Sequence, residues 1–144
     1  MKKIERRYRK VVWLSGLYDF IVTLPFALPG LVGVQLEALA KIQGWLGLTG
    51  QFPVFEPVHL FLLNLLGTIV IIWAGLRIAK PEPLFGLVDS IGRSAFSSLM
   101  LYYLVVWGIP QVVMLFLIPE ILFGIAQLVG YWLYRQSQRE PIGR

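Results

Sequence analysis

Two carboxylates inside long apolar segments are the residues of this sequence best suited to do chemistry. Asp19 lies in the apolar run that begins at Val11, and Glu120 lies in the run that ends at Tyr134. Placing an ionised side chain inside a bilayer costs at least ~2.5 kcal/mol, so such residues are usually paired, hydrated or functional. Asp19 and Glu120 are therefore candidates for a ligand or proton site.

Other polar residues recur at helical spacing around these carboxylates. Ser15 and Asp19 are four residues apart, and Glu120, Gly124 and Gln127 follow one another at spacings of four and three. Residues at these spacings share one face of a helix, so each helix is predicted to turn a polar face towards its neighbours. The candidate site residues are Asp19, Glu120, Asn64, Gln127 and Tyr102.

The carboxylates allow a structural and a functional interpretation. In the structural one, Asp19 pairs with Arg77 or Arg93 and Glu120 bonds to a tyrosine, which ties the helices together. In the functional one, both carboxylates lie near the bilayer midplane, about 12–13 Å from the membrane edges at 1.5 Å per residue. There they would share a proton and line a pocket. A third possibility is that Glu120 is a first-turn residue of a helix that begins at Pro119.

This chain has few residues that could bind a metal ion or a cofactor. It has no cysteine and a single histidine, His59, which excludes a haem with two histidine ligands from one chain and any cysteine-ligated metal. No phosphate-binding loop or HExxH motif is present. We expect no metal and no cofactor, and we expect His59 to hydrogen bond to Glu56.

The composition is typical of a protein that uses lipid as its solvent. Hydrophobic residues make up 57% of the 144 residues and charged residues only 15%, whereas soluble domains carry about 25% charged residues. Apolar runs long enough to cross a bilayer as helices are predicted at 11–28, 58–79, 90–107 and 111–134. The expected fold is a single all-α membrane domain over residues 1–144, an up-down bundle of four transmembrane helices.

One boundary in this scheme has two solutions. Gly108 and Pro110 interrupt the apolar tract that runs to Tyr134, and Pro119 interrupts it again. A turn at Gly108–Pro110 gives helices of adequate length on both sides, the first of them capped by Asp89 or Ser90, and we favour it. A turn at Pro119 would leave only about 16 residues for the last crossing, which is short for a core of about 30 Å.

The outer-face loop between the first two predicted spans, residues 33–57, has its own pattern. Gln35–Leu46 predicts an amphipathic helix with Leu39, Ile42 and Leu46 on its apolar face. Together with nearby tryptophan and phenylalanine residues, this favours a layer that lies on the membrane surface. A solvated loop is the alternative.

The basic residues predict the orientation. Of the thirteen lysines and arginines, six lie in the first ten residues, and others, including Arg77, Lys80 and Arg93, flank apolar runs. Only Lys41 falls in the loop 33–57. Cytoplasmic loops are enriched in basic residues, so we expect an inner-membrane protein with both termini in the cytoplasm. This distribution accounts for the net charge of +5, and nucleic acid is not an expected partner.

The sequence does not identify the molecule that this protein handles. The leading expectation is a non-enzymatic bundle that binds or transports a small hydrophobic or cationic compound, with proton coupling through Asp19 or Glu120. One alternative is a membrane enzyme acting on a lipid-like substrate, with these two carboxylates as acid and base. Another is a structural subunit of a larger membrane complex. The expected partners are the lipid bilayer and this compound, and a homodimer or larger complex is left open.

Overall fold

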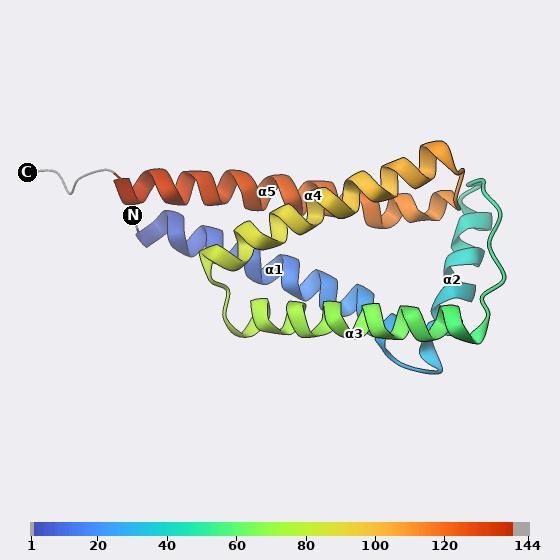
Figure 1. The fold of residues 1–144 in the computed structure, drawn as a ribbon. Helices are drawn as coiled ribbons and strands as arrows, with labels where there is room; N and C mark the ends of the chain where they lie inside the picture. The colour runs from blue at the N-terminus through green and yellow to red at the C-terminus, as the bar shows by residue number, and fades with distance from the viewer. Residues whose placement is uncertain (1, 140–144) are drawn as a thin grey trace, which may run out of the picture.

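The computed structural model describes residues 2–139, and every regular element within that range is a helix. The all-α prediction is therefore confirmed. The elements in chain order are α1 (Lys2–Ala27), α2 (Leu31–Trp45), α3 (Pro57–Ala79), α4 (Pro83–Val106), the short 3-10 helix η1 (Gln111–Val113) and α5 (Met114–Arg139). Figure 1 shows α2 lying across one end of the assembly formed by the four longer helices.

Three segments of the described chain are long and apolar enough to cross a membrane. They are Lys3–Ala27, Pro57–Ala79 and Gln111–Arg139, with mean hydropathies of 1.3, 2.0 and 2.3. Helix α4 is equally long, but Asp89, Arg93 and several serines lower its hydropathy. The predicted count of four membrane spans is therefore not confirmed, because only three described segments qualify by length and composition.

Helix α4 begins seven residues earlier than predicted. We expected a start at Ser90, with Asp89 or Ser90 as the cap, but the helix begins at Pro83 directly after Glu82. Proline is favoured in the first turn of a helix because its missing N–H has no partner there and its φ is already helical. The turn after α3 is therefore short, and Asp89 lies within α4 instead of capping it.

The chain turns at residues 107–110 and not at Pro119. Helix α4 ends at Val106, η1 begins at Gln111, and Pro119 lies inside α5. Gly108 has a φ of 58°, a left-handed conformation that glycine adopts without a steric penalty.

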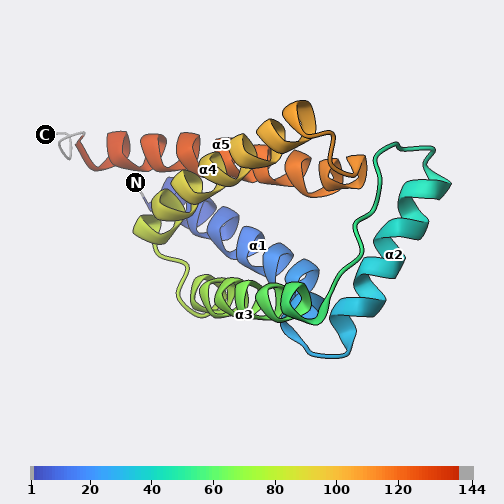
Figure 2. The same ribbon diagram turned by 45° about the vertical axis from the view of Figure 1, so that its right-hand side comes forward.

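Helix α2 is fastened to the turn between α4 and α5. The side-chain amide of Gln43 donates to the carbonyl of Gly50, and its oxygen accepts the N–H of Val112. Val32, Leu39 and Gln43 form the buried side of α2, whereas Ile42 and Leu46 are exposed. The sequence analysis did not predict that Gln43 is buried, because a polar side chain next to the expected apolar face gives no such signal. Figure 2 shows the same crosswise placement of α2 from a second direction.

The long helices pack in the order α3, α1, α5 and α4, and the first and last of these make little contact with each other. Helix α1 packs along both α3 and α5, and α4 packs mainly along α5. Helices α3 and α4 are joined by a short turn but diverge from it and make little contact with each other (Figure 1). The contact between α1 and α3 is close at Gly67, where an added Cβ would lie 2.6 Å from the backbone nitrogen of Ala27.

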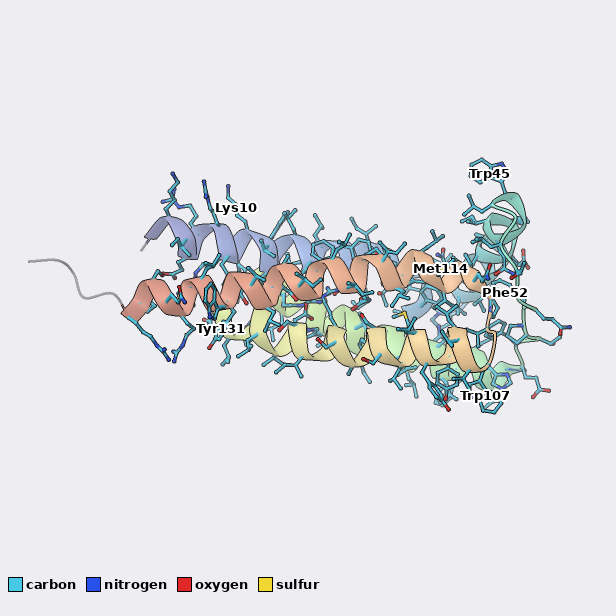
Figure 3. The ribbon with its side chains drawn as sticks, turned by 90° about the horizontal axis from the view of Figure 1, so that it is seen from above. Lys10, Trp45, Phe52, Trp107, Met114 and Tyr131 are labelled. Atoms are coloured by element: carbon cyan, nitrogen blue, oxygen red, sulfur yellow. The ribbon has the colours of Figure 1, made fainter. Side chains whose placement is uncertain are left out.

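The two ends of the helical assembly differ in composition. Helix α1 starts, α5 finishes and α3 turns into α4 at one end, while α2 and the turn at 107–110 lie at the other (Figure 1). Figure 3 shows Lys10 and Tyr131 towards the first end and Trp45, Phe52 and Trp107 at the second. Basic residues such as Lys10 thus lie at the first end, whereas aromatic residues lie at both ends.

Candidate functional site

Five charged side chains from all four long helices meet in the interior. We call this group, Asp19, Arg77, Asp89, Arg93 and Glu120, the charge cluster. Asp19 comes from α1, Arg77 from α3, Asp89 and Arg93 from α4, and Glu120 from α5. The two arginines are almost completely enclosed, with 0% of Arg77 and 2% of Arg93 exposed. Charges enclosed to this degree are stable only when they are paired and hydrogen-bonded.

Arg77 joins α3 to α1 and α4. Its Nη2 donates to Oδ2 of Asp19 at 2.5 Å, and its Nη1 donates to Oδ2 of Asp89 at 2.5 Å and to Oγ of Ser15 at 3.1 Å. The guanidinium also lies 5.6 Å from the ring centroid of Trp73, one turn earlier in the same helix. This distance permits a cation–π interaction. Arg77 is therefore fixed by groups from three helices.

Arg93 reaches all three carboxylates of the cluster. It donates through Nη2 to Asp19 at 2.6 Å, through Nε to Asp89 at 2.9 Å and through Nη1 to Glu120 at 2.9 Å. Its guanidinium lies 5.2 Å from the ring centroid of Phe123. Because Asp19 and Glu120 bind different nitrogens of this one side chain, Arg93 bridges them.

Asp89 accepts more hydrogen bonds than the other carboxylates. Its Oδ1 accepts the indole N–H of Trp73 at 2.8 Å, and its Oδ2 accepts from Arg77, Arg93 and the side chain of Gln127. Gln127 donates at 2.8 Å to Asp89 and at 2.7 Å to Ser15. Asp89 thus accepts hydrogen bonds from two guanidinium groups and two neutral donors.

The charge cluster contains one more acid than base. Two guanidinium groups and three carboxylates have a formal net charge of 2 − 3 = −1 when all are ionised. Glu120 is the least satisfied acid, because its Oε2 is buried and has no hydrogen-bond partner among the described residues. An isolated negative charge is costly in a low-dielectric interior, so a proton or another cation is needed to balance it.

A cavity of about 410 Å³, which we call the central cavity, lies against the charge cluster. Asp19, Asp89, Arg93 and Glu120 line its polar part. Its apolar walls come mainly from the diverging helices α3 and α4 and include Val70, Trp73, Val88, Phe96 and Met100. Pockets of this size, mostly apolar with a few convergent polar groups, are typical of small-molecule sites.

A smaller groove lies between α4 and α5. It has a volume of about 150 Å³ and is lined by Ser97 and Glu120, among others. Ser97 Oγ, like Glu120 Oε2, is buried without a hydrogen-bond partner in the described chain. Glu120 and Arg93 line both this groove, which we call the α4–α5 groove, and the central cavity.

Three of the five predicted site residues lie in or beside the charge cluster. Asp19 and Glu120 belong to it, and Gln127 is completely buried against Asp89. The ion pair that the structural interpretation predicted for Asp19 is present with both Arg77 and Arg93. Arg93 also replaces the tyrosine that we expected as the partner of Glu120. Within the described residues no hydrogen bond joins the two carboxylates directly, and each binds a different nitrogen of Arg93 instead.

The other two predicted residues lie elsewhere. Asn64 was expected to face the carboxylates, but it donates to the carbonyl of Phe26, where α1 approaches α3, and it does not line the central cavity. Tyr102 is 50% exposed and packs against Tyr103 near the end of α4. His59 accepts the backbone N–H of Glu56 at the start of α3, as predicted.

Sequence reasoning missed Asp89 as a site residue, and it gave the two arginines two roles, as partners of Asp19 and as surface charges. Arg77 and Arg93 were counted among the cytoplasmic charges that set the orientation, but they are buried and cannot act as surface charges. The spacing of four residues between Trp73 and Arg77, and again between Asp89 and Arg93, could have revealed them. Residues four apart face the same way on a helix, so these pairs indicate side chains that stabilise each other.

Comparisons with known proteins give no further information about this site. Neither the protein-family models nor the curated proteins nor the solved structures contain a match to this chain. Within residues 2–139 no group of three or more histidine, aspartate or glutamate side chains is arranged to hold a metal ion. The three carboxylates of the charge cluster direct their oxygens towards guanidinium groups instead.

Proposed function

We propose that this protein is a membrane protein that binds a small amphipathic cation in the central cavity, in exchange for a proton. The observation that carries the proposal is the excess of one carboxylate at the polar end of a cavity of about 410 Å³ with apolar walls. A cation with an apolar body would balance this charge and cover the walls at the same time.

Glu120 is the residue that would exchange the proton. Asp89 accepts four hydrogen bonds and Asp19 accepts from both arginines, whereas Glu120 accepts from Arg93 alone. The proton is therefore best accommodated on Glu120 when the cavity is empty. A cation bound near Glu120 would favour its ionised form and so release the proton.

The ligand would reach the cavity from the bilayer. Helices α3 and α4 diverge beside the cavity, and the residues along this opening are apolar, including Val70 and Phe96. A lipophilic cation dissolved in the membrane could therefore enter sideways without crossing water. Transport across the membrane would require a further opening of the same cavity towards one of the two aqueous phases.

We further propose that α4 is a fourth crossing. The protein would then lie in the inner membrane with both chain termini in the cytoplasm. The placement of both ends of the described chain at one end of the helices supports an even number of crossings. The exposed basic residues of α1 and α5 at that end support its cytoplasmic location.

Two probes of the same shape and opposite charge test the proposal. Radiolabelled tetraphenylphosphonium and tetraphenylborate would be equilibrated with the protein in lipid nanodiscs, and bound probe would be measured by dialysis. We expect saturable binding of the cation only, with one proton released per cation bound in a weakly buffered solution. Equal binding of the anion would show that the cavity selects for apolar surface and not for charge.

Substitutions test whether the proton is exchanged at Glu120. Glu120→Gln should abolish proton release and weaken cation binding at least 10-fold, roughly the effect of one lost charged contact of 1.4 kcal/mol. Tyr102→Phe is the matched control, because Tyr102 lies outside the cavity. Unchanged proton release in Glu120→Gln would remove Glu120 from the mechanism.

A further inference from the structure

The end of α5 carries a second recess that is separate from the charge cluster. It has a volume of about 470 Å³ and is formed by one face of α5 between Leu128 and Arg139. We call it the α5 groove. We propose that the α5 groove, together with the neighbouring α4–α5 groove, binds one anionic phospholipid. This proposal does not depend on the function of the central cavity.

The chemistry of the α5 groove changes along the helix. Arg135 and Arg139 are one turn apart and both line it, so their guanidinium groups can converge on one phosphate. Trp132 lies one turn further into the helix and is well exposed, as expected of an aromatic residue at the level of the lipid headgroups. The groove is thus basic near the end of α5, at Arg135 and Arg139, and amphipathic one turn further into the helix, at Trp132.

An apolar path continues from this basic end towards the middle of the protein. Leu128 lines both the α5 groove and the α4–α5 groove, so the two are continuous along α5. Beyond Leu128 the path passes Ile125 and Ile121, which are exposed. These side chains offer a surface for an acyl chain.

The length of the path matches one leaflet. Fourteen residues separate Ile121 from Arg135, which corresponds to about 21 Å of helix at 1.5 Å per residue. Half of a bilayer, headgroups included, is about 20–22 Å thick. A phospholipid with its phosphate at Arg135 and Arg139 would therefore end its acyl chain near Ile121.

Charge decides between a lipid and a second copy of this chain. A symmetric dimer formed through this face would bring Arg135 and Arg139 of one copy close to the same residues of the other. Such like charges repel, whereas a phosphate attracts both. Each basic residue near an anionic membrane surface contributes about 1 kcal/mol, so two should favour an anionic lipid about 30-fold over a zwitterionic one.

Quenching of Trp132 fluorescence tests this inference on the full-length protein. The protein would be reconstituted in mixtures of phosphatidylcholine and phosphatidylglycerol, with bromine atoms on the acyl chains of one lipid at a time. The contribution of Trp132 is obtained by subtracting the emission of Trp132→Phe. We expect brominated phosphatidylglycerol to quench Trp132 at a much lower mole fraction than brominated phosphatidylcholine, with a preference that falls as salt is added.

Matched variants separate this site from general surface charge. Arg135→Gln with Arg139→Gln should abolish the preference, and Arg135→Lys with Arg139→Lys should retain most of it. The control is Arg6→Gln with Arg7→Gln, which removes two exposed positive charges from α1. Soluble glycerol phosphate should not displace the lipid, because it lacks the acyl chains.

Three outcomes would overturn the inference. The first is equal quenching by both lipids in the unmodified protein. The second is an equal loss of preference in the Arg6 and Arg7 control. The third is protection of Trp132 from both brominated lipids together with a dimeric mass in light scattering, which would assign this face to a second copy of the chain.

Discussion

Arg93 donates a hydrogen bond of 2.9 Å from its Nη1 to Oε1 of Glu120, and it is the side chain that bridges Glu120 to Asp19. One arginine on α4 thereby connects carboxylates from α5 and α1. Since Arg93 is 2% exposed, it has exchanged its entire hydration shell for these contacts. The stability of the helix assembly and the protonation of its carboxylates should both depend on this residue.

Removing Arg93 should destabilise the protein strongly. Arg93→Met leaves Asp19, Asp89 and Glu120 around a single guanidinium, and breaking a buried ion pair in this way costs about 3–5 kcal/mol. Thermal unfolding in mild detergent, followed by circular dichroism, would measure the loss. Arg6→Met, on the exposed side of α1, is the control and should change the melting temperature little. A comparable melting temperature for both variants would contradict the structural role of Arg93.

The carboxylates should differ in their tolerance of neutral substitution. Asp89→Asn weakens bonds to Trp73, Arg77, Arg93 and Gln127, and it places an amide N–H₂ among donors. Hydrogen bonds to charged groups contribute about 1.5–3 kcal/mol each. Glu120→Gln affects one such bond and leaves two positive and two negative charges. Asp89→Asn should therefore unfold at a markedly lower temperature than Glu120→Gln. The reverse order would show that the number of hydrogen bonds to each carboxylate does not determine the loss of stability.

The close approach of α1 and α3 should be sensitive to a single methyl group. An added Cβ at Gly67 would lie 2.6 Å from a backbone atom of Ala27, so Gly67→Ala must push the two helices apart. Overpacking of this kind typically costs about 1–3 kcal/mol. Gly75→Ala on the same helix is the control, since nothing lies within 4 Å of its added Cβ. Equal melting temperatures for the two variants would show that α1 and α3 are not packed this closely.

The sequence predicted the helices better than it predicted the site. Apolar runs indicate helices regardless of their partners, and the glycine and proline at 108 and 110 correctly located a turn. The start of α4 was missed because Pro83 was assigned to a turn and not to the first position of a helix. That error left Asp89 outside the helix and hid its relation to Arg93.

The pairing of Asp19 with Arg77 or Arg93 was predicted, but the use of these arginines as cytoplasmic surface charges failed for a different reason. A sequence gives the position of an arginine along the chain but not the direction in which its long side chain extends. Both residues flank apolar runs, a pattern typical of basic residues that extend into the cytoplasm. They extend inward because the packing of three helices brings Asp19, which is distant from both arginines in the sequence, to the same level as Asp89.

Topology can be tested directly, because the chain has no cysteine of its own. Single substitutions Lys41→Cys, Lys80→Cys and Gln138→Cys would introduce exposed thiols into α2, the turn between α3 and α4, and the end of α5. In intact cells a membrane-impermeant maleimide should label only position 41. Positions 80 and 138 should react after the membrane is permeabilised. Labelling of position 80 in intact cells would show that α3 and α4 do not form the proposed pair of crossings.

The protonation of Glu120 gives the last prediction. The charge cluster has one excess carboxylate, and Glu120 has a buried oxygen without a partner among the described residues, so Glu120 should carry a proton at pH 7 when the cavity is empty. Infrared spectroscopy of the protein in nanodiscs should then show the stretching band of a protonated carboxyl group. The band should disappear as the pH rises and the proton is lost.

Substitutions identify the group that gives this band. The groups that face Glu120 are Arg93, Asp89, Asp19 and Tyr18. The variants used for the assignment should therefore leave the charges of Arg93, Asp89 and Asp19 unchanged. Glu120→Gln should remove the band at pH 7 while the protein stays folded. Tyr18→Phe should leave it in place, because a tyrosine hydroxyl does not absorb in this region. If the band is absent from the unmodified protein, or persists in Glu120→Gln, another group balances the cluster and the proposed exchange of a proton for a cation at Glu120 is wrong.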